Sequence, residues 1–246
     1  MNPIQRILTI DMAPFFYIPH LPDVTVLELD ADTSHHIAQV LRMRIGEALQ
    51  LTDGLGNKAL GHLAAVSKKA CTVHLEQRTV TNRIGRSVRM AVAPVKNNSR
   101  YEWFIEKATE LGVSDIHPLI CERTEKQHLR PDRLRQVSIA AMLQSQQVWL
   151  PNLHEPTPIA SLIRSWEVEG LQRLIAHCND AERKSISAIQ LMQSVGILIG
   201  PEGDFTPGEI HTAREAGFVA VQLGGTRLRT ETAGVVGAAW LRLQTG

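Results

Sequence analysis

The sequence is poor in cysteine and has no long apolar run. Its three cysteines, Cys71, Cys121 and Cys178, lie far apart and form no C-x-x-C pair, so neither a disulfide framework nor a zinc site is expected. No apolar stretch approaches the length of a membrane span, and the first residues lack the pattern of a signal peptide. Residues 1–13 are expected to form a loose leader. These absences favour the reducing cytosol.

The chain also lacks a strong net charge and the common phosphate-binding motifs. The formal net charge is +1, so global charge argues neither for nor against nucleic acid. Six basic residues lie between Arg78 and Arg100 with no acid between Glu76 and Glu102, which fits a solvated linker and a phosphate-facing seam equally well. No P-loop, no G-x-G-x-x-G, no nucleophile motif and no cluster of metal ligands is present, so no metal is expected.

Residues 15–76 predict a small, mostly β unit. Asp53-Gly54-Leu55-Gly56 separates two apolar runs and is a hairpin signal. Asp32-Thr33-Ser34 predicts the cap of a helix through residues 35–42. The mostly polar stretch from Thr79 to Ser87 predicts a domain boundary. The expected strands are residues 15–17, 24–29, 49–52, 60–66 and 70–76.

From residue 88 strands and helices alternate, which predicts a parallel sheet with helices on both faces. Ser99 with Glu102 predicts a capping box for the first helix. Pro118 predicts an edge position or an early break for its strand. The expected strands are residues 88–95, 115–121, 171–178, 195–199 and 218–223, and the expected helices are residues 101–111, 134–148, 185–192, 207–216 and 230–243.

Two glycine-marked turns near the end of the chain predict a ligand site. Gly200-Pro201-Glu202-Gly203 follows one strand and Gly224-Gly225 follows the next. After the first turn, Thr206, Pro207 and Glu209 predict a capping box with proline at the first helical position. The carboxyl ends of neighbouring parallel strands form a crevice where open α/β sheets bind ligands.

The last helix carries two features that call for a partner. Arg227 and Arg229 precede its first turn, where cations oppose the helix dipole, so we expect an anion such as a phosphate or carboxylate beside them. Gly234 and Gly237 lie inside the helix, where glycine costs roughly 1 kcal/mol relative to alanine. Close packing against another segment, a ligand or a second subunit would offset that cost, and ordinary packing on the sheet is an equal alternative.

Several stretches resemble the RsmE family of small-subunit ribosomal RNA methyltransferases. The two C-terminal signatures are Leu198-Ile-Gly-Pro-Glu-Gly-Asp-Phe205 and Leu223-Gly-Gly-Thr-Arg-Leu-Arg-Thr-Glu-Thr-Ala233. Agreement extends to residues 36–46, 96–100, 106–112 and 121–124. The segment Ala140-Ala-Met-Leu-Gln-Ser-Gln-Gln147 departs from the family, because it lacks the acids and the arginine that many members carry there.

The resemblance implies a SPOUT-type parallel sheet with a C-terminal trefoil knot in residues 87–246, and a PUA-like RNA-binding β-barrel in residues 14–82. It also implies a cytoplasmic homodimer that uses S-adenosylmethionine to methylate N3 of a uridine in 16S rRNA, within the small ribosomal subunit. An RNA-binding or assembly factor that kept this fold without the chemistry is the alternative.

The implied site residues follow the matched motifs. Cofactor contacts are expected along both signatures, at Leu198, Ile199, Gly200, Pro201, Gly203, Leu223, Gly224, Leu228, Thr230, Thr232 and Ala233. Arg229 is the expected stabiliser of a uridine anion, and Glu231 is a second catalytic candidate whose place in the first helical turn also explains it. RNA phosphates are expected at Arg42, Lys96, Arg100 and Arg123.

Overall fold

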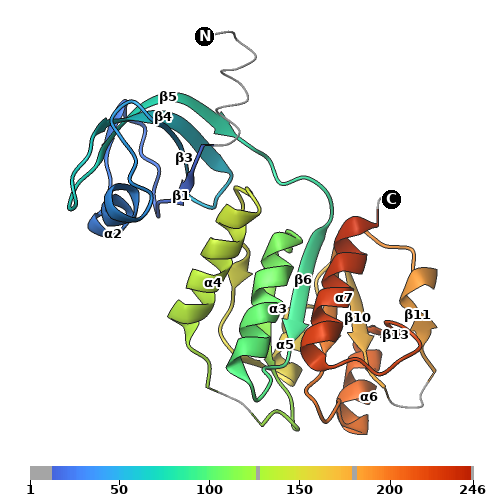
Figure 1. Ribbon diagram of the computed structural model, residues 1–246. Coiled ribbons are helices and arrows are strands. Elements are labelled where there is room, and N and C mark those ends of the chain that lie inside the picture. The colour runs from blue at the N-terminus through green and yellow to red at the C-terminus, as the bar shows by residue number, and fades with distance from the viewer. Residues whose placement is uncertain (1–12, 126–127, 179–181, 245–246) are drawn as a thin grey trace. The chain divides into compact units, whose positions relative to one another are not determined.

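A computed structural model describes residues 13–125, 128–178 and 182–244, so the predicted leader lies outside them up to residue 12. The chain forms two compact units (Figure 1). The first contains the chain up to Arg83 together with Met142–Trp149, and the second contains Ile84–Ala141 and the chain from Leu150. Among the described residues, no helix is both long and apolar enough to cross a membrane.

The first unit is built on a five-stranded sheet with the order β1-β3-β4-β5-β2. The strands are β1 (Phe15–Tyr17), β2 (Val26–Glu28), β3 (Ala48–Thr52), β4 (Asn57–Ala65) and β5 (Thr72–Val80). The predicted hairpin joins β3 to β4, and the Asp53 carboxylate accepts hydrogen bonds from the Leu55 and Asn57 backbone. Trp149 belongs to this unit because its indole Nε1 donates to the Thr81 carbonyl at 2.9 Å.

The helix of the first unit begins earlier than predicted. Asp30, and not Asp32-Thr33-Ser34, caps α2 (Ala31–His35), since its side chain accepts from the Thr33 backbone N–H at 2.9 Å. The chain then continues as the π-helix η1 (His36–Val40). The predicted cap was wrong because the segment 32–34 already lies inside the first helical turn.

The second unit is an α/β unit on a parallel sheet with the strand order β11-β13-β10-β12-β6-β7-β8, and β9 pairs with β7. The strands are β6 (Ser87–Val92), β7 (Asp115–Ile120), β8 (Asn152–Leu153), β9 (Thr157–Pro158), β10 (Leu171–Ala176), β11 (Lys184–Ser185), β12 (Ser194–Ile199) and β13 (Val219–Gln222). Every pairing is parallel, as predicted.

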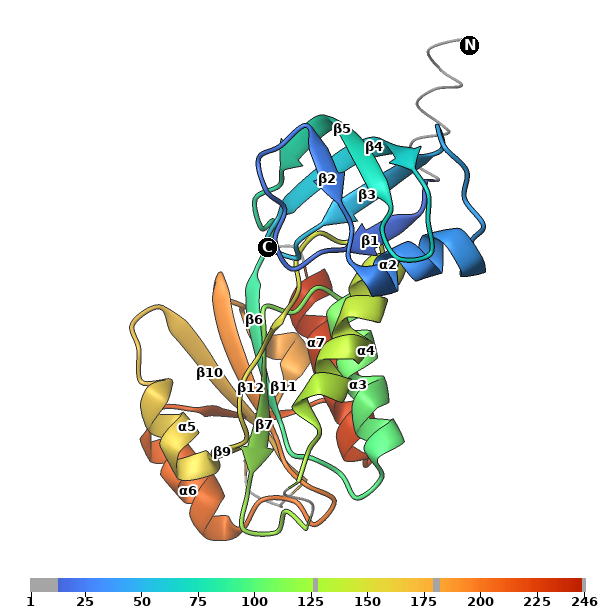
Figure 2. The same ribbon diagram turned by 90° about the vertical axis from the view of Figure 1, so that its left-hand side faces the viewer.

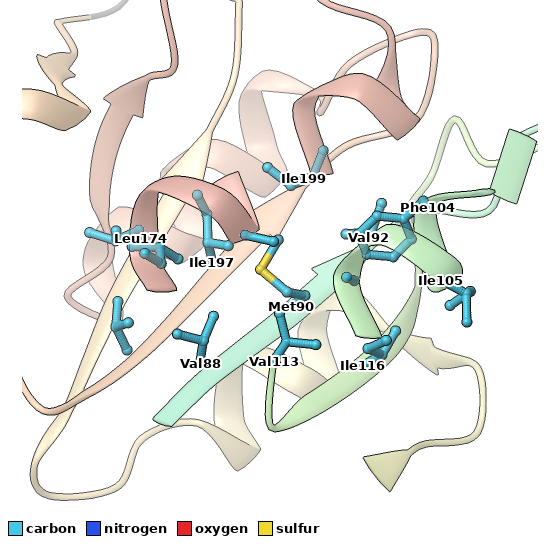
Figure 3. Packing of buried hydrophobic residues seen from close by; sticks show 14 of the residues in the cluster. Val88, Met90, Val92, Phe104, Ile105, Val113, Ile116, Leu174, Ile197 and Ile199 are labelled. Carbon is cyan, nitrogen blue, oxygen red and sulfur yellow. The ribbon is translucent and has the colours of Figure 1, made fainter. Parts of the chain in front are cut away.

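Helices cover both faces of this sheet (Figure 2). One face carries α3 (Asn98–Glu110), α4 (Pro131–Gln144) and α7 (Thr230–Leu243), and the other carries α5 (Ile159–Ser165) and α6 (Pro207–Glu215). Side chains alternate along β6, so that Val88, Met90 and Val92 pack beneath α3 and α7 (Figure 3). Ala91 and Ala93 face the cluster that contains α5 and α6.

Two predictions in this unit were wrong, and a third was half right. The segment 185–192 is not a helix; Ser185 pairs with Gln222 of β13, and only a 3-10 turn, η2 (Ile186–Ala188), follows. Ser99 does not cap α3, because Asn97 accepts from the Ser99 backbone N–H at 2.9 Å. Pro118 predicted an edge position or an early break. The break does not occur, because β7 runs on to Ile120 and Pro118 pairs with Val92 of β6. On its other side β8 and β9 pair before and after the proline and leave it unpaired, as at a sheet edge.

Helix α7 packs closely on α3. A Cβ at Gly234 would lie 2.7 Å from the Phe104 ring, whereas a Cβ at Gly237 would lie 3.6 Å from Met90. Gly234 therefore permits the contact between the two helices. The close packing expected from the sequence is supplied by the chain itself, in the second unit.

The end of α7 is bonded to the start of β6. Arg86 donates from Nη1 to the carbonyls of Leu241 and Gln244, each at 2.8 Å, and from Nε to the Met192 carbonyl at 2.6 Å. Arg242 in turn donates to the carbonyls of Arg86 and Leu111. These bonds join the first and last elements of the second unit.

Candidate functional site

A pocket of about 630 Å³ lies at the carboxyl ends of β10, β12 and β13, where the sequence predicted a crevice. Because β10 lies between the other two strands, the turns after all three meet at this edge. The lining is formed by residues 176–178, 183, 199–202, 204, 221–230 and 233.

Most residues predicted to contact a cofactor line this pocket: Ile199, Gly200, Pro201, Leu223, Gly224, Leu228, Thr230 and Ala233, with Arg229 beside them. Three others do not line it. Leu198 is fully buried in the cluster beneath α5 and α6, Gly203 lies against the Arg123 side chain, and Thr232 is half-buried in α7.

The turn after β12 is fixed by hydrogen bonds. Asp204 has a φ of 61°, and its two carboxylate oxygens accept from the backbone N–H groups of Cys178, at 2.8 Å, and of Phe205, at 2.9 Å. The predicted capping box of Thr206 and Glu209 is confirmed. The Thr230 hydroxyl donates to the Gly200 carbonyl at 3.0 Å, so that the start of α7 is tied to this turn.

The turn after β13 is open. A Cβ at Gly224 or Gly225 would meet nothing within 4 Å. Arg229 is the N-cap residue of α7, and its side chain makes no capping bond. The exposed guanidiniums of Arg227 and Arg229 have no hydrogen-bond or ion-pair partner in the described part of the chain, although two cations at a helix N-terminus oppose its dipole.

Glu231 is not among the residues that line the pocket. Its buried carboxylate lies 3.8 Å from Arg100 Nε, which connects the starts of α3 and α7. This position fits a structural acid better than a group that touches a ligand in the pocket.

The other predicted RNA-contacting residues are divided between the units. Arg42 is exposed in the first unit. In the second, Lys96 pairs with Glu125 at 2.8 Å, which raises the pKa of its ammonium above the ordinary value. Arg123 donates to the Gly203 carbonyl at 2.8 Å. Lys96, through its backbone N–H to Glu202, and Arg123 thus lie beside the turn after β12, and Arg100 lies at the start of α7.

Sequence reasoning missed the contribution of β10 to the pocket. Ala176 ends that strand, His177 and Cys178 follow it directly, and Arg183 lies soon after them. The predicted end of the strand at residues 176–178 already indicated these residues, because parallel strands end at the same edge of the sheet. The strand order, with β10 central, was not available from the sequence.

One group in the described residues has the spacing of metal ligands: Asp115, His117 and His154. The His154 Nε2 lies 3.0 Å from Asp115 Oδ1, and the two imidazoles stack with centroids 3.8 Å apart at 7°. Burial, with a smaller effect of His154, lowers the pKa of His117 to about 4. Ring nitrogens in parallel stacked planes do not converge on one ion, so this geometry is a histidine–aspartate hydrogen bond with a ring stack.

Comparison with known proteins decides the family. A family model described as an RNA methyltransferase domain matches residues 83–242, and one described as an RNA methyltransferase PUA domain matches residues 29–76. A ribosomal RNA small subunit methyltransferase E from Mycobacterium bovis is 33% identical over 92% of this chain and 89% of its own length. The chain belongs to the ribosomal RNA small subunit methyltransferase E family, RsmE.

Solved structures agree with this membership. The crystal structure of a probable rRNA-methyltransferase from Porphyromonas gingivalis is 36% identical, has a TM-score of 0.86 and covers 94% of this chain and 98% of that one. A ribosomal RNA small subunit methyltransferase E from Neisseria gonorrhoeae, bound to S-adenosyl methionine, is 26% identical with a TM-score of 0.82, covering 94% and 97%. The family match confirms the predicted α/β fold and PUA-like first unit.

Proposed function

We propose that this RsmE-family chain methylates N3 of a uridine in the 16S rRNA of the small ribosomal subunit, with S-adenosylmethionine as methyl donor. The observation that carries the proposal is Arg229, an exposed cation without a partner among the described residues at the rim of an open pocket. The relatives that match over most of the chain are named ribosomal RNA methyltransferases, which favours catalysis over a purely RNA-binding role.

The pocket fits the proposed cofactor. Its volume of about 630 Å³ lies within the roughly 300–1,000 Å³ of small-molecule and cofactor sites. Ile199, Leu223 and Leu228 supply apolar lining, and the open backbone at Gly224 and Gly225 supplies hydrogen-bonding groups that no side chain covers. When bound, S-adenosylmethionine supplies an electrophilic methyl group on a sulfonium.

The chain must handle the proton and charge of the uridine. N3 carries a proton that has to leave for the nitrogen lone pair to accept a methyl group. A guanidinium at Arg229 lowers the cost of the resulting negative charge on the uracil ring, because a cation beside the ring stabilises charge as it develops. Arg227, Lys96, Arg100 and Arg123 are proposed to hold the RNA phosphates.

The trefoil knot, the homodimer and the cytoplasmic location belong to the same proposal. The bond from Thr230 to Gly200 and the position of both turns at one pocket support a knotted arrangement. Trp103 and Leu243 of the second unit expose 40% and 70% of their surface, which supports a subunit contact. A ribosomal substrate supports the proposed cytoplasmic location.

The test is methylation of 16S rRNA, free and in small subunits taken from cells that lack this enzyme. Replacing Arg229 by alanine should lower the rate about 100-fold or more, with affinity for S-adenosylhomocysteine, measured by calorimetry, nearly unchanged. Arg214→Ala, an exposed arginine of α6 outside the pocket, is the matched control. Full activity of Arg229→Ala would contradict the role of Arg229 in stabilising the uridine anion. A wild-type chain that binds no S-adenosylhomocysteine would favour the non-catalytic alternative.

A further inference from the structure

Four of the described residues that line the pocket carry an ionisable side chain that can accept a proton: His177, Cys178, Glu202 and Asp204. Asp204 is committed, because its two oxygens accept from the backbone N–H groups of Cys178 and Phe205. His177 is buried, with 4% of its surface exposed. Cys178 carries a free thiol, which must lose its own proton before it can accept one. Glu202 is therefore the lining acid whose carboxylate is available to a ligand.

The Glu202 carboxylate is held at one oxygen and free at the other. Its Oε1 accepts from the Lys96 backbone N–H at 3.1 Å. Its Oε2 has no hydrogen-bond or ion-pair partner in the described part of the chain, and the side chain is exposed. One bond orients the group while a second acceptor site stays open, and a general base needs both properties.

Glu202 lies where the order of the strands reverses. From β6 the chain passes through α3 to β7 on one side, whereas β12 and β10 lie on the other side of β6. Open α/β sheets bind ligands at such a reversal. The bond between Glu202 and Lys96 joins the segments that follow β12 and β6. The Thr230 hydroxyl, bonded to the Gly200 carbonyl, brings Arg229 to the same turn.

A free carboxylate is unexpected among cations that are proposed to hold RNA. The hydrogen bond to Glu125, and to a lesser degree the charge of Glu202, raises the pKa of Lys96, so its ammonium lies within range of both acids. An acid beside bound phosphates weakens RNA binding, so a role in the chemistry accounts for Glu202 better than phosphate recognition does. The other charged groups around this turn are Arg100, Arg123, Asp204 and Arg229.

We propose that Glu202 is the general base that removes the N3 proton of the uridine, an inference that rests on the proposed function. The N3–H bond breaks, the proton passes to Oε2, and the electron pair stays on the nitrogen. That pair forms the bond to the methyl carbon as the bond from this carbon to sulfur breaks and leaves its pair on sulfur. The carboxylic acid then releases its proton to water. Cytidine has no N3 proton, so this base acts on uridine.

The experiment compares Glu202→Gln with the wild type in single-turnover methylation of small subunits reconstituted from unmethylated 16S rRNA transcript. Glutamine keeps an oxygen for the Lys96 N–H and cannot take the proton. At pH 7 the rate should fall about 100-fold or more, with affinity for S-adenosylhomocysteine, measured by calorimetry, nearly unchanged. Glu169→Gln, which alters an exposed acid before β10 at the amino end of that strand, is the matched control and should react as the wild type does.

Two further readouts separate proton removal from positioning. Free carboxylic acids ionise below pH 6, so the wild-type rate should stay level between pH 6 and 8. The Glu202→Gln rate should rise about 10-fold per pH unit, because this variant acts only on uridine that has already lost its proton. In subunits built with 5-fluorouridine transcript, whose N3 proton is more acidic, the deficit of Glu202→Gln should shrink several-fold.

The outcomes distinguish this base from the proposed function. A Glu202→Gln rate equal to the wild type, with the same pH profile, would overturn the base and leave the methyltransferase assignment intact. A rate lowered equally at every pH, with the same deficit on 5-fluorouridine RNA, would make Glu202 a positioning residue and would also overturn the proposal. A wild-type chain that binds S-adenosylhomocysteine but methylates no uridine N3 would overturn the proposed function itself.

Discussion

The turn after β12 and the turn after β13 border the same pocket, but only the first is bonded along its length. In the first, Asp204 accepts two backbone hydrogen bonds and Thr206 begins α6 with a capping box. In the second, Gly224 and Gly225 face open space and the arginines that follow have no described partner. The first turn is a preformed wall of the site. The second turn exposes backbone groups and arginine side chains that are available to contact a ligand.

This difference between the bonded turn and the open turn fits the proposal that one pocket binds both a cofactor and an RNA substrate. A small cofactor binds most tightly to a wall that needs no rearrangement, because ordering a loop on binding costs free energy. A large anionic substrate gains most from free cations at the rim, which raise its rate of encounter. Changes to the pocket-lining residues of the first turn should therefore alter stability and cofactor affinity together, and changes in the second should leave stability intact.

The largest effect is expected at Asp204. Alanine at this position would keep the strained φ of 61° and would remove the acceptor of two backbone N–H groups. The free energy of unfolding should fall by about 2–4 kcal/mol, and affinity for S-adenosylhomocysteine by about 10-fold. Urea unfolding and calorimetry measure the two quantities.

Two further variants separate the causes at this position. Asp204→Gly relieves the strain without restoring the acceptor, and Asp204→Asn tolerates the conformation and keeps one oxygen. Asparagine should retain most of the affinity and glycine should not. If Asp204→Ala bound the cofactor as tightly as the wild type, the first turn would not act as a preformed wall.

A smaller effect is expected at Thr206. Its replacement by alanine removes the N-cap of α6 and half of the capping box, so the free energy of unfolding should fall by about 1 kcal/mol. Thr206 does not line the pocket, and affinity for S-adenosylhomocysteine should not change. Thr212→Ala, an exposed position in the same helix, serves as the control, and an equal loss in both variants would contradict a capping effect.

The smallest effect on stability is expected at Gly224. A Cβ there meets nothing within 4 Å, so Gly224→Ala should change the free energy of unfolding by less than about 0.5 kcal/mol. Affinity for S-adenosylhomocysteine should nevertheless fall several-fold, because the methyl group would cover backbone that the ligand approaches. Unchanged affinity would show that the cofactor does not contact the second turn. Gly208→Ala, in α6, is the control.

Local signals predicted much of the second unit. The bounds of α7 agree with the prediction, and Thr206 with Glu209 forms the expected capping box, because both depend on residues within one helical turn. The glycines of the turns after β12 and β13 also predicted the edge of the sheet at which the pocket lies. The parallel sheet followed from the alternation of strands and helices, which needs no knowledge of strand order.

Other features depended on contacts that a single segment does not encode. Ser185 joins a strand because β13 offers an edge to it, and β8 and β9 are too short for any periodicity to appear. Asn97 outcompetes Ser99 as a cap, although both are suitable residue types. The lining by His177 and Cys178 required the position of β10 between β12 and β13, and the domain bounds 14–82 and 87–246 stay predictions.

The bonds of Arg86 have a consequence for synthesis on the ribosome. β6 is an inner strand of the sheet and the first of its unit to be made, yet Arg86 meets Leu241 only 155 positions later. At roughly 5–20 residues per second, the nascent chain waits on the order of ten seconds before that contact can form. β7 follows β6 early and can cover one of its edges, whereas β12, which covers the other edge, is completed only at Ile199, so the newborn second unit exposes an unpaired strand edge until then.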